Sequence, residues 1–326
     1  QHHAISSIAD FVAARYGKSG PLASMVTILA VIAIIPYLAL QLRAIALSAA
    51  VILEPTAGSI ASTTNGVLFL TGILAILAMI FGTRQIANTE QHGGLMLAVA
   101  FESFVKLFAL LCVAIFFVFA APENIHQISK DVAETFHQVQ LIGVPDTFWI
   151  QTLLAGLAII CLPRQFHVAV VELRDEKHIR GARRWFAVYL VLTIIAIIPI
   201  ASWALHATPG YLAIPDVAVL SLPLSYGQDW LTLLAFLGGF SASTGMLLVS
   251  SVALSIMLSN DLIMPALWRT NLLSRHDKRL PLVLKFTRRV CILAVMLLGF
   301  LFFHFFNDID QLSVFGLLAF SAVAQF

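Results

Sequence analysis

Residues 153–171 read LLAGLAIICLPRQFHVAVV, an apolar run that is interrupted at Pro163 and Arg164 and then resumes. Uncharged stretches of this kind recur along the chain, whose 326 residues are 60% hydrophobic and only 11% charged. A soluble domain cannot bury that much apolar surface in one core. Within lipid each segment must satisfy its own backbone polar groups, so we predict eight membrane helices, at roughly 21–52, 64–83, 93–120, 147–171, 185–206, 229–260, 290–306 and, incomplete, from 314.

The fold class predicted is therefore an all-α integral membrane protein, with residues 1–326 forming one domain. The sequence opens without Met and stops inside an apolar run, so we expect it to be a piece cut at both ends from a longer protein. The three cysteines, Cys112, Cys161 and Cys291, lie inside apolar runs and are expected to pack as small hydrophobic side chains.

The basic residues assign the two sides of the membrane. Fifteen of the 19 Lys and Arg residues fall in alternate gaps between the apolar runs, and the intervening gaps hold only Lys130. The positive-inside rule then places the N-terminus in the cytoplasm. Because these residues mark helix ends and form no basic patch with interleaved aromatics, membrane lipid and not nucleic acid is the expected neighbour. The outer gap contains residues 127–140, whose mixed polarity predicts an amphipathic surface helix.

Polar groups at mid-membrane are the candidate functional residues. Proline removes a helical hydrogen bond, and around Pro163 the side chains of Arg164, Gln165 and His167 lie at one depth. Broken helices with such polar groups build substrate cavities in transporters. The alternative is a simple proline kink from which Arg164 reaches the cytoplasmic interface.

Glu102 and Lys106 are four residues apart on one predicted helix and share a face. An ionisable side chain at the bilayer centre costs roughly 2.5 to 3.5 kcal/mol on insertion scales, so such a pair needs a reason. It is either a structural ion pair or part of a proton relay. Arg43 lies nearer the end of its segment, where its side chain can also extend to the interface.

Residues 238–245 read GGFSASTG. Small residues permit close helix packing, and the hydroxyls of Ser241 and Thr244, one turn apart, also suit an alkali cation; both interpretations stand. No nucleophile–base pair, carboxylate pair or metal cluster is visible in the sequence, so we expect no catalytic site in this segment and no cofactor besides a coupling ion, Na⁺ or H⁺.

Several segments resemble a known family. Residues 7–18 resemble the cytoplasmic segment before the third core helix of the sodium:solute symporters. A narrower resemblance, to the transporter half of CbrA-type hybrid sensor histidine kinases, covers essentially the whole chain and is most specific at residues 161–172. The segments that carry it are PYLALQLR (36–43), FGTR (81–84), AFESFVK (100–106), CLPRQFHV (161–168), FLGGFS (236–241) and SND (259–261).

This resemblance implies the leucine-transporter-type bundle of two inverted five-helix repeats, of which the chain would cover about core helices three to ten. It implies substrate contacts from Tyr37 and Gln41 and from the Pro163-to-His167 segment, with Arg164, Gln165 and His167 as the polar groups. Ser241, Ser243 and Thr244 would bind sodium. The family's adjacent hydroxyl pair can be matched to Ser243-Thr244 or to Ser241 followed by Ala242, so proton coupling through Glu102 or His167 stays open.

The implied function is ion-coupled transport or sensing of a small solute, an amino acid and by resemblance histidine. The domain would be the input part of a sensor histidine kinase in a bacterial cytoplasmic membrane, and the complete protein would carry the kinase region that signals to a response regulator. The alternative is a stand-alone symporter with no signalling role.

Overall fold

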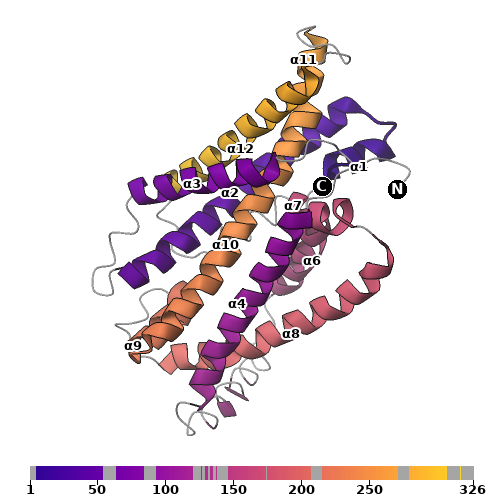
Figure 1. Ribbon diagram of the computed structural model, residues 1–326. Coiled ribbons are helices and arrows are strands. Elements are labelled where there is room, and N and C mark those ends of the chain that lie inside the picture. The colour runs from indigo at the N-terminus through magenta and orange to yellow at the C-terminus, as the bar shows by residue number, and fades with distance from the viewer. Residues whose placement is uncertain are drawn as a thin grey trace.

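The computed structural model describes residues 5–53, 64–83, 93–119, 146–173, 175–206, 215–270 and 279–306, with a few isolated positions between them. All regular elements in these residues are helices, and none of these residues forms a strand (Figure 1). The predicted all-α class is therefore confirmed for the part of the chain that the structure describes.

Six helices are long and apolar enough to cross a membrane, judged by length and composition. They are α2 (Gly20–Leu53), α3 (Thr64–Gly82), α4 (Gly93–Phe119), α8 (Lys177–His206), α10 (Asp229–Met257) with its helical continuation, and α12 (Leu280–Phe305). The chain is thus a multi-pass membrane protein. The shorter elements are α1 (Ile8–Arg15), α6 (Asp146–Cys161), α7 (Pro163–Phe166), η1 (His167–Val171), η2 (Pro215–Val217), α9 (Ala218–Ser225), η3 (Leu258–Ile263) and α11 (Met264–Arg269).

The observed helices differ from the predicted ones in length. The segment predicted at 147–171 is no single span, because α6 ends at Cys161 and a new helix starts at Pro163. Helices α8 and α12 begin eight and ten residues before the predicted starts of 185 and 290. Hydropathy marks only the long apolar part of a helix. Helix α8 opens with basic turns, and α12 carries Lys285, Arg288 and Arg289 before its long apolar part. The predicted segment from 314 lies outside the described residues.

Residues 127–140 are also mostly outside the described part. The described positions in this range are helical and exposed, and they agree with the predicted surface helix. They are Ser129, Lys130, Ala133, Glu134 and His137. The helix predicted at 229–260 continues past its predicted end, because α10, η3 and α11 form a continuous helical stretch from Asp229 to Arg269 of 41 residues.

Helix α10 runs through the middle of the bundle, with α2, α3 and α12 on one side and α4 on the other; α8 packs against α4 beyond it (Figure 1). Small residues allow these close approaches. A methyl group at Gly238 of α10 would lie 2.8 Å from the Ala109 side chain of α4, and one at Gly299 of α12 would lie 3.0 Å from Leu38 of α2. The packing role expected for the glycines of residues 238–245 is therefore real at Gly238.

The buried apolar side chains form two clusters. The larger one joins α1, α2, α3, α7 and α12 to the second half of α10, and the smaller one joins α4, α8 and α9 to its first half. Between the two halves lies the polar stretch of α10 from Ser241 to Gly245. The carboxylate of Glu102, which lies against Gly245, is thus held between two apolar cores.

Candidate functional site

The break between α6 and α7 has a local cause. A residue that precedes proline is disfavoured in the helical region, and Leu162 is extended, with φ −62° and ψ 121°. Pro163 then occupies the first turn of α7, where its missing N–H costs nothing. Helix α7 continues directly into the π-helical turn η1. The broken helix predicted from the sequence is confirmed, and the break places Arg164 at the first turn of the new helix.

The Arg164 side chain is directed toward α2. Its Nη1 lies 3.5 Å from the hydroxyl of Tyr37, and that hydroxyl donates a hydrogen bond of 3.0 Å to the Sδ of Met246 on α10. The Nε of Arg164 is buried and has no hydrogen-bond partner among the described residues. Buried polar atoms in native proteins are almost always paired, so an unpaired guanidinium N–H indicates a place for a further acceptor.

Two ionisable groups of α4 face the same region. Glu102 is buried, and a methyl group at Gly245 would overlap its carboxylate, so the carboxylate lies directly against the α10 backbone. Arg164 and Lys106 are the cations that act electrostatically on Glu102. No salt bridge joins Glu102 to Lys106 in the described part of the chain, so the structural ion pair, one of the two interpretations of these residues, is not formed. With all three groups ionised, the cluster carries one positive charge in excess.

Three hydroxyl side chains were predicted to bind sodium. Ser241 lies one helical turn before Gly245, and Ser243 and Thr244 directly precede it. Thr244 donates a 2.9 Å hydrogen bond to the Ser241 carbonyl, which leaves the lone pairs of its hydroxyl available. Ser243 is buried, and Ser241 and Thr244 are half-buried. The Glu102 carboxylate therefore lies within one residue of Thr244 along α10, a neighbour that spacing alone did not reveal.

Two of the predicted substrate residues, Gln41 and Gln165, do not join Arg164 and Tyr37. Gln41 is buried on α2, Gln165 is exposed, and neither makes a hydrogen bond to that pair. His167 is buried in η1, with its Nε2 3.4 Å from the Oε1 of Glu172, which is equally buried. His167 therefore faces an acidic partner in its own turn. Glu172 was not singled out by the sequence, because only the π-helical turn brings the two side chains together.

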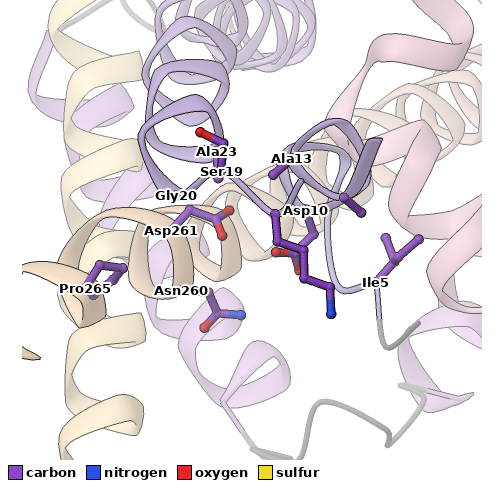
Figure 2. Close-up of a pocket in the computed structure, with 11 residues that line it drawn as sticks. Ile5, Asp10, Ala13, Ser19, Gly20, Ala23, Asn260, Asp261 and Pro265 are labelled. Carbon is purple, nitrogen blue, oxygen red and sulfur yellow. The ribbon is translucent and has the colours of Figure 1, made fainter. Parts of the chain in front are cut away.

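A second polar group, also missed, lies at the end of α10 near α1. The buried Asp261 carboxylate accepts hydrogen bonds from Thr27 (3.3 Å) and Ser7 (3.4 Å), and its backbone carbonyl accepts one from Ser24 (2.7 Å). Asp261 also lines a cavity of about 440 Å³ that Asp10 of α1 lines from the other side, and the two carboxylates face each other there (Figure 2). The sequence feature that could have revealed this group is Asp261 itself, a carboxylate close to the end of a long apolar run.

No family model, characterised protein or solved structure matched the chain in comparisons of all three kinds. Among the described residues, no three or more His, Cys, Asp and Glu side chains are grouped to hold a metal ion. The strongest local arrangement is the group of Tyr37, Glu102, Lys106 and Arg164, which comes from three different helices.

Proposed function

We propose that this chain is the membrane domain of an ion-coupled secondary transporter for a small carboxylate-bearing solute, an amino acid. The observation that carries the proposal is Arg164, a guanidinium at a helix break inside the bundle whose buried Nε has no described partner. A solute carboxylate can accept from a guanidinium through two parallel hydrogen bonds, which are among the strongest that proteins form.

The charges around Arg164 favour such an anion. Arg164 and Lys106 outnumber the single carboxylate of Glu102, and burying an uncompensated charge is costly. A bound carboxylate would neutralise the cluster and pair the Arg164 Nε. The Tyr37 hydroxyl, 3.5 Å from the guanidinium, would then form part of the same site. Gln41 and Gln165 are second-choice contacts, since neither makes a hydrogen bond to this pair among the described residues, and the imidazole of His167 faces Glu172.

The coupling ion would bind beside the solute. Glu102 supplies a negative charge next to the hydroxyl segment Ser241-to-Thr244, and that combination suits either Na⁺ held by oxygen atoms or a proton carried by the carboxylate. The proposed architecture is the leucine-transporter-type bundle of two inverted repeats, in which solute and ion sites lie near the bilayer midplane at broken helices. The broken helix α6–α7 and the polar centre of α10 support it.

We further propose that the domain senses its solute for a cytoplasmic histidine kinase in a bacterial inner membrane, with its N-terminus in the cytoplasm. This proposal depends on the family resemblance of residues 36–43 and 161–172 and on the one-sided basic residues. A stand-alone symporter is the alternative. Solute-dependent phosphorylation in the full-length protein distinguishes the two, since a stand-alone symporter would show none.

The experiment that tests transport is uptake of radiolabelled amino acids, L-histidine first, into proteoliposomes with Na⁺ and H⁺ gradients imposed separately. We expect accumulation under one of the two gradients and its loss in the Arg164→Ala variant. The exposed Arg269→Ala variant is the matched control and should transport normally. If no amino acid accumulates under either gradient, the transport proposal is wrong.

A further inference from the structure

The first two turns of α8 carry an unusual concentration of unpaired positive charge. Lys177, Arg180, Arg183 and Arg184 are all exposed, and within the part of the chain that the structure describes none of them forms an ion pair or side-chain hydrogen bond. At 100° per residue the four side chains fall on one helical face about 120° wide. Other basic residues are engaged differently: Arg15 stacks on the ring of Phe11, for example.

The length of α8 fixes the depth of this face. The uncharged part of the helix, residues 185–204, has twenty residues, which at ~1.5 Å per residue spans about 30 Å, the thickness of the hydrocarbon layer. If that part fills the hydrocarbon, residues 177–184 extend about 12 Å further, into the layer of lipid headgroups. Trp185, which is 74% exposed, lies at the boundary, where tryptophan is enriched in membrane proteins.

Among the described helices, none covers this face. Helix α8 packs against α4 and, through its distant half, against α9, while residues 177–188 are exposed throughout. The nearby acidic groups do not neutralise it. Asp175 accepts a hydrogen bond from the backbone N–H of Lys177 and so caps the helix, and Glu176 is exposed and bridges to none of the four.

We propose that the basic face formed by Lys177, Arg180, Arg183 and Arg184 binds the phosphate groups of anionic phospholipids. Guanidinium groups pair with phosphate oxygens through two hydrogen bonds, and several cations close to the membrane surface attract anionic lipid cooperatively. The unpaired side chains, their position in the headgroup layer and the adjacent Trp185 together favour a lipid over an acidic protein partner. This inference does not depend on the proposed transport.

The test measures lipid binding to the purified protein in a neutral detergent. Phosphatidylglycerol, or phosphatidylcholine as the zwitterionic comparison, is titrated in, and the bound lipid is counted by native mass spectrometry. We expect the wild type to retain phosphatidylglycerol and not phosphatidylcholine, and the binding to weaken as NaCl is raised. Each cation near a membrane surface is worth about fivefold in affinity, so the triple variant Arg180→Gln/Arg183→Gln/Arg184→Gln should bind roughly a hundredfold more weakly.

Two further variants keep the test decisive. The control Arg15→Gln/Lys18→Gln/Arg269→Gln removes the same charge from exposed positions elsewhere and should weaken binding by only a few-fold. The triple lysine variant at 180, 183 and 184 keeps the charge but not the paired guanidinium hydrogen bonds, so it should bind less tightly than the wild type and far more tightly than the glutamine variant, which also separates lost binding from misfolding. Equal phosphatidylglycerol binding by the wild type and the glutamine variant, or equal losses in both glutamine variants, would overturn the proposal and leave this face to an acidic protein partner.

Discussion

The contact between Glu102 and Gly245 shows how one residue without a side chain positions a charge. Glycine at 245 leaves the space that the carboxylate of Glu102 occupies against the α10 backbone. Without it, α4 and α10 could not bring the Glu102 carboxylate against the backbone of α10 at this position. The function of this glycine is therefore steric, and it can be tested independently of any transported solute.

The Gly245→Ala variant should be destabilised, because the added methyl group would overlap the Glu102 carboxylate. The carboxylate is the end of a flexible side chain and can shift, so the cost should lie at the low end of overpacking, about 1 kcal/mol, and should appear as a lower melting temperature in detergent. Gly239→Ala is the control, since a methyl group there meets nothing within 4 Å. The combination Glu102→Ala/Gly245→Ala should recover part of the loss. Equal melting temperatures for the two single variants would exclude the proposed contact.

Single residues were predicted unevenly by the sequence. Arg164 and Glu102 were predicted as site residues because the sequence alone shows a charged residue inside an apolar run. Their shared neighbourhood was not, because it depends on how α4, α7 and α10 pack. Gln165 was predicted by adjacency to Arg164, yet neighbouring residues on a helix point about 100° apart, and its side chain is exposed.

Among the elements, the broken helix α6–α7 was the best predicted, because proline acts locally on its own backbone. Helix starts were predicted too late at α8 and α12, since basic turns continue these helices beyond their apolar parts. The π-helical turns η1 and η3 were not foreseen, because no local sequence rule produces them. They matter here because η1 pairs His167 with Glu172 and η3 carries Asp261.

Replacing Pro163 by alanine should weaken solute binding by tenfold or more. Alanine would allow Leu162 to become helical, so that α6 and α7 could join and Arg164 would turn away from Tyr37. The control is Pro199→Ala in the interior of α8, where the helix is already continuous and binding should not change. Equilibrium binding of radiolabelled amino acid measures both variants, and unchanged affinity in Pro163→Ala would show that the break is not needed.

Asp261 is expected to hold helix α1 against the end of α10. Replacing it by alanine removes the acceptor of the Ser7 hydroxyl at the start of α1 and of the Thr27 hydroxyl on α2, two bonds worth about 1 kcal/mol each. Because one of these bonds holds α1, the backbone amides of α1 should then exchange with deuterium about fivefold faster in mass-spectrometric measurements. Asn260→Ala, which changes a neighbour lining the same cavity, should leave α1 protected. Unaltered exchange in Asp261→Ala would mean that apolar packing alone holds α1.

For the whole molecule, composition was sufficient to predict a helical membrane protein, and the distribution of basic residues predicts its orientation. Lys18 and Asp261 line one cavity, so the start of α2 and the end of α10 lie on the same side of the bundle (Figure 2). Ser225 precedes α10 and therefore lies toward the opposite side. The contacts between helices that are far apart in the sequence, in contrast, could not be predicted from the sequence.

Single cysteines at these positions test the orientation. Lys18→Cys and Arg269→Cys should react with a membrane-impermeant thiol reagent only after permeabilisation, because both are expected in the cytoplasm. Ser225→Cys should react in intact cells. The wild type is the background control, since its described cysteines lie buried or half-buried in apolar helices. Reaction of Lys18→Cys in intact cells would reverse the orientation.

The central claim is that Arg164 binds the carboxylate of a small solute inside the bundle. The most direct measurement is equilibrium binding of radiolabelled L-histidine and other amino acids to the purified protein and to Arg164→Ala, with amino-acid amides as competitors. Removing one partner of a buried charge pair typically costs at least about thirtyfold in affinity, so we predict such a loss in Arg164→Ala and no competition by the amides, which lack the carboxylate. Unchanged affinity in Arg164→Ala, or amides that compete as well as the acids, would contradict the claim.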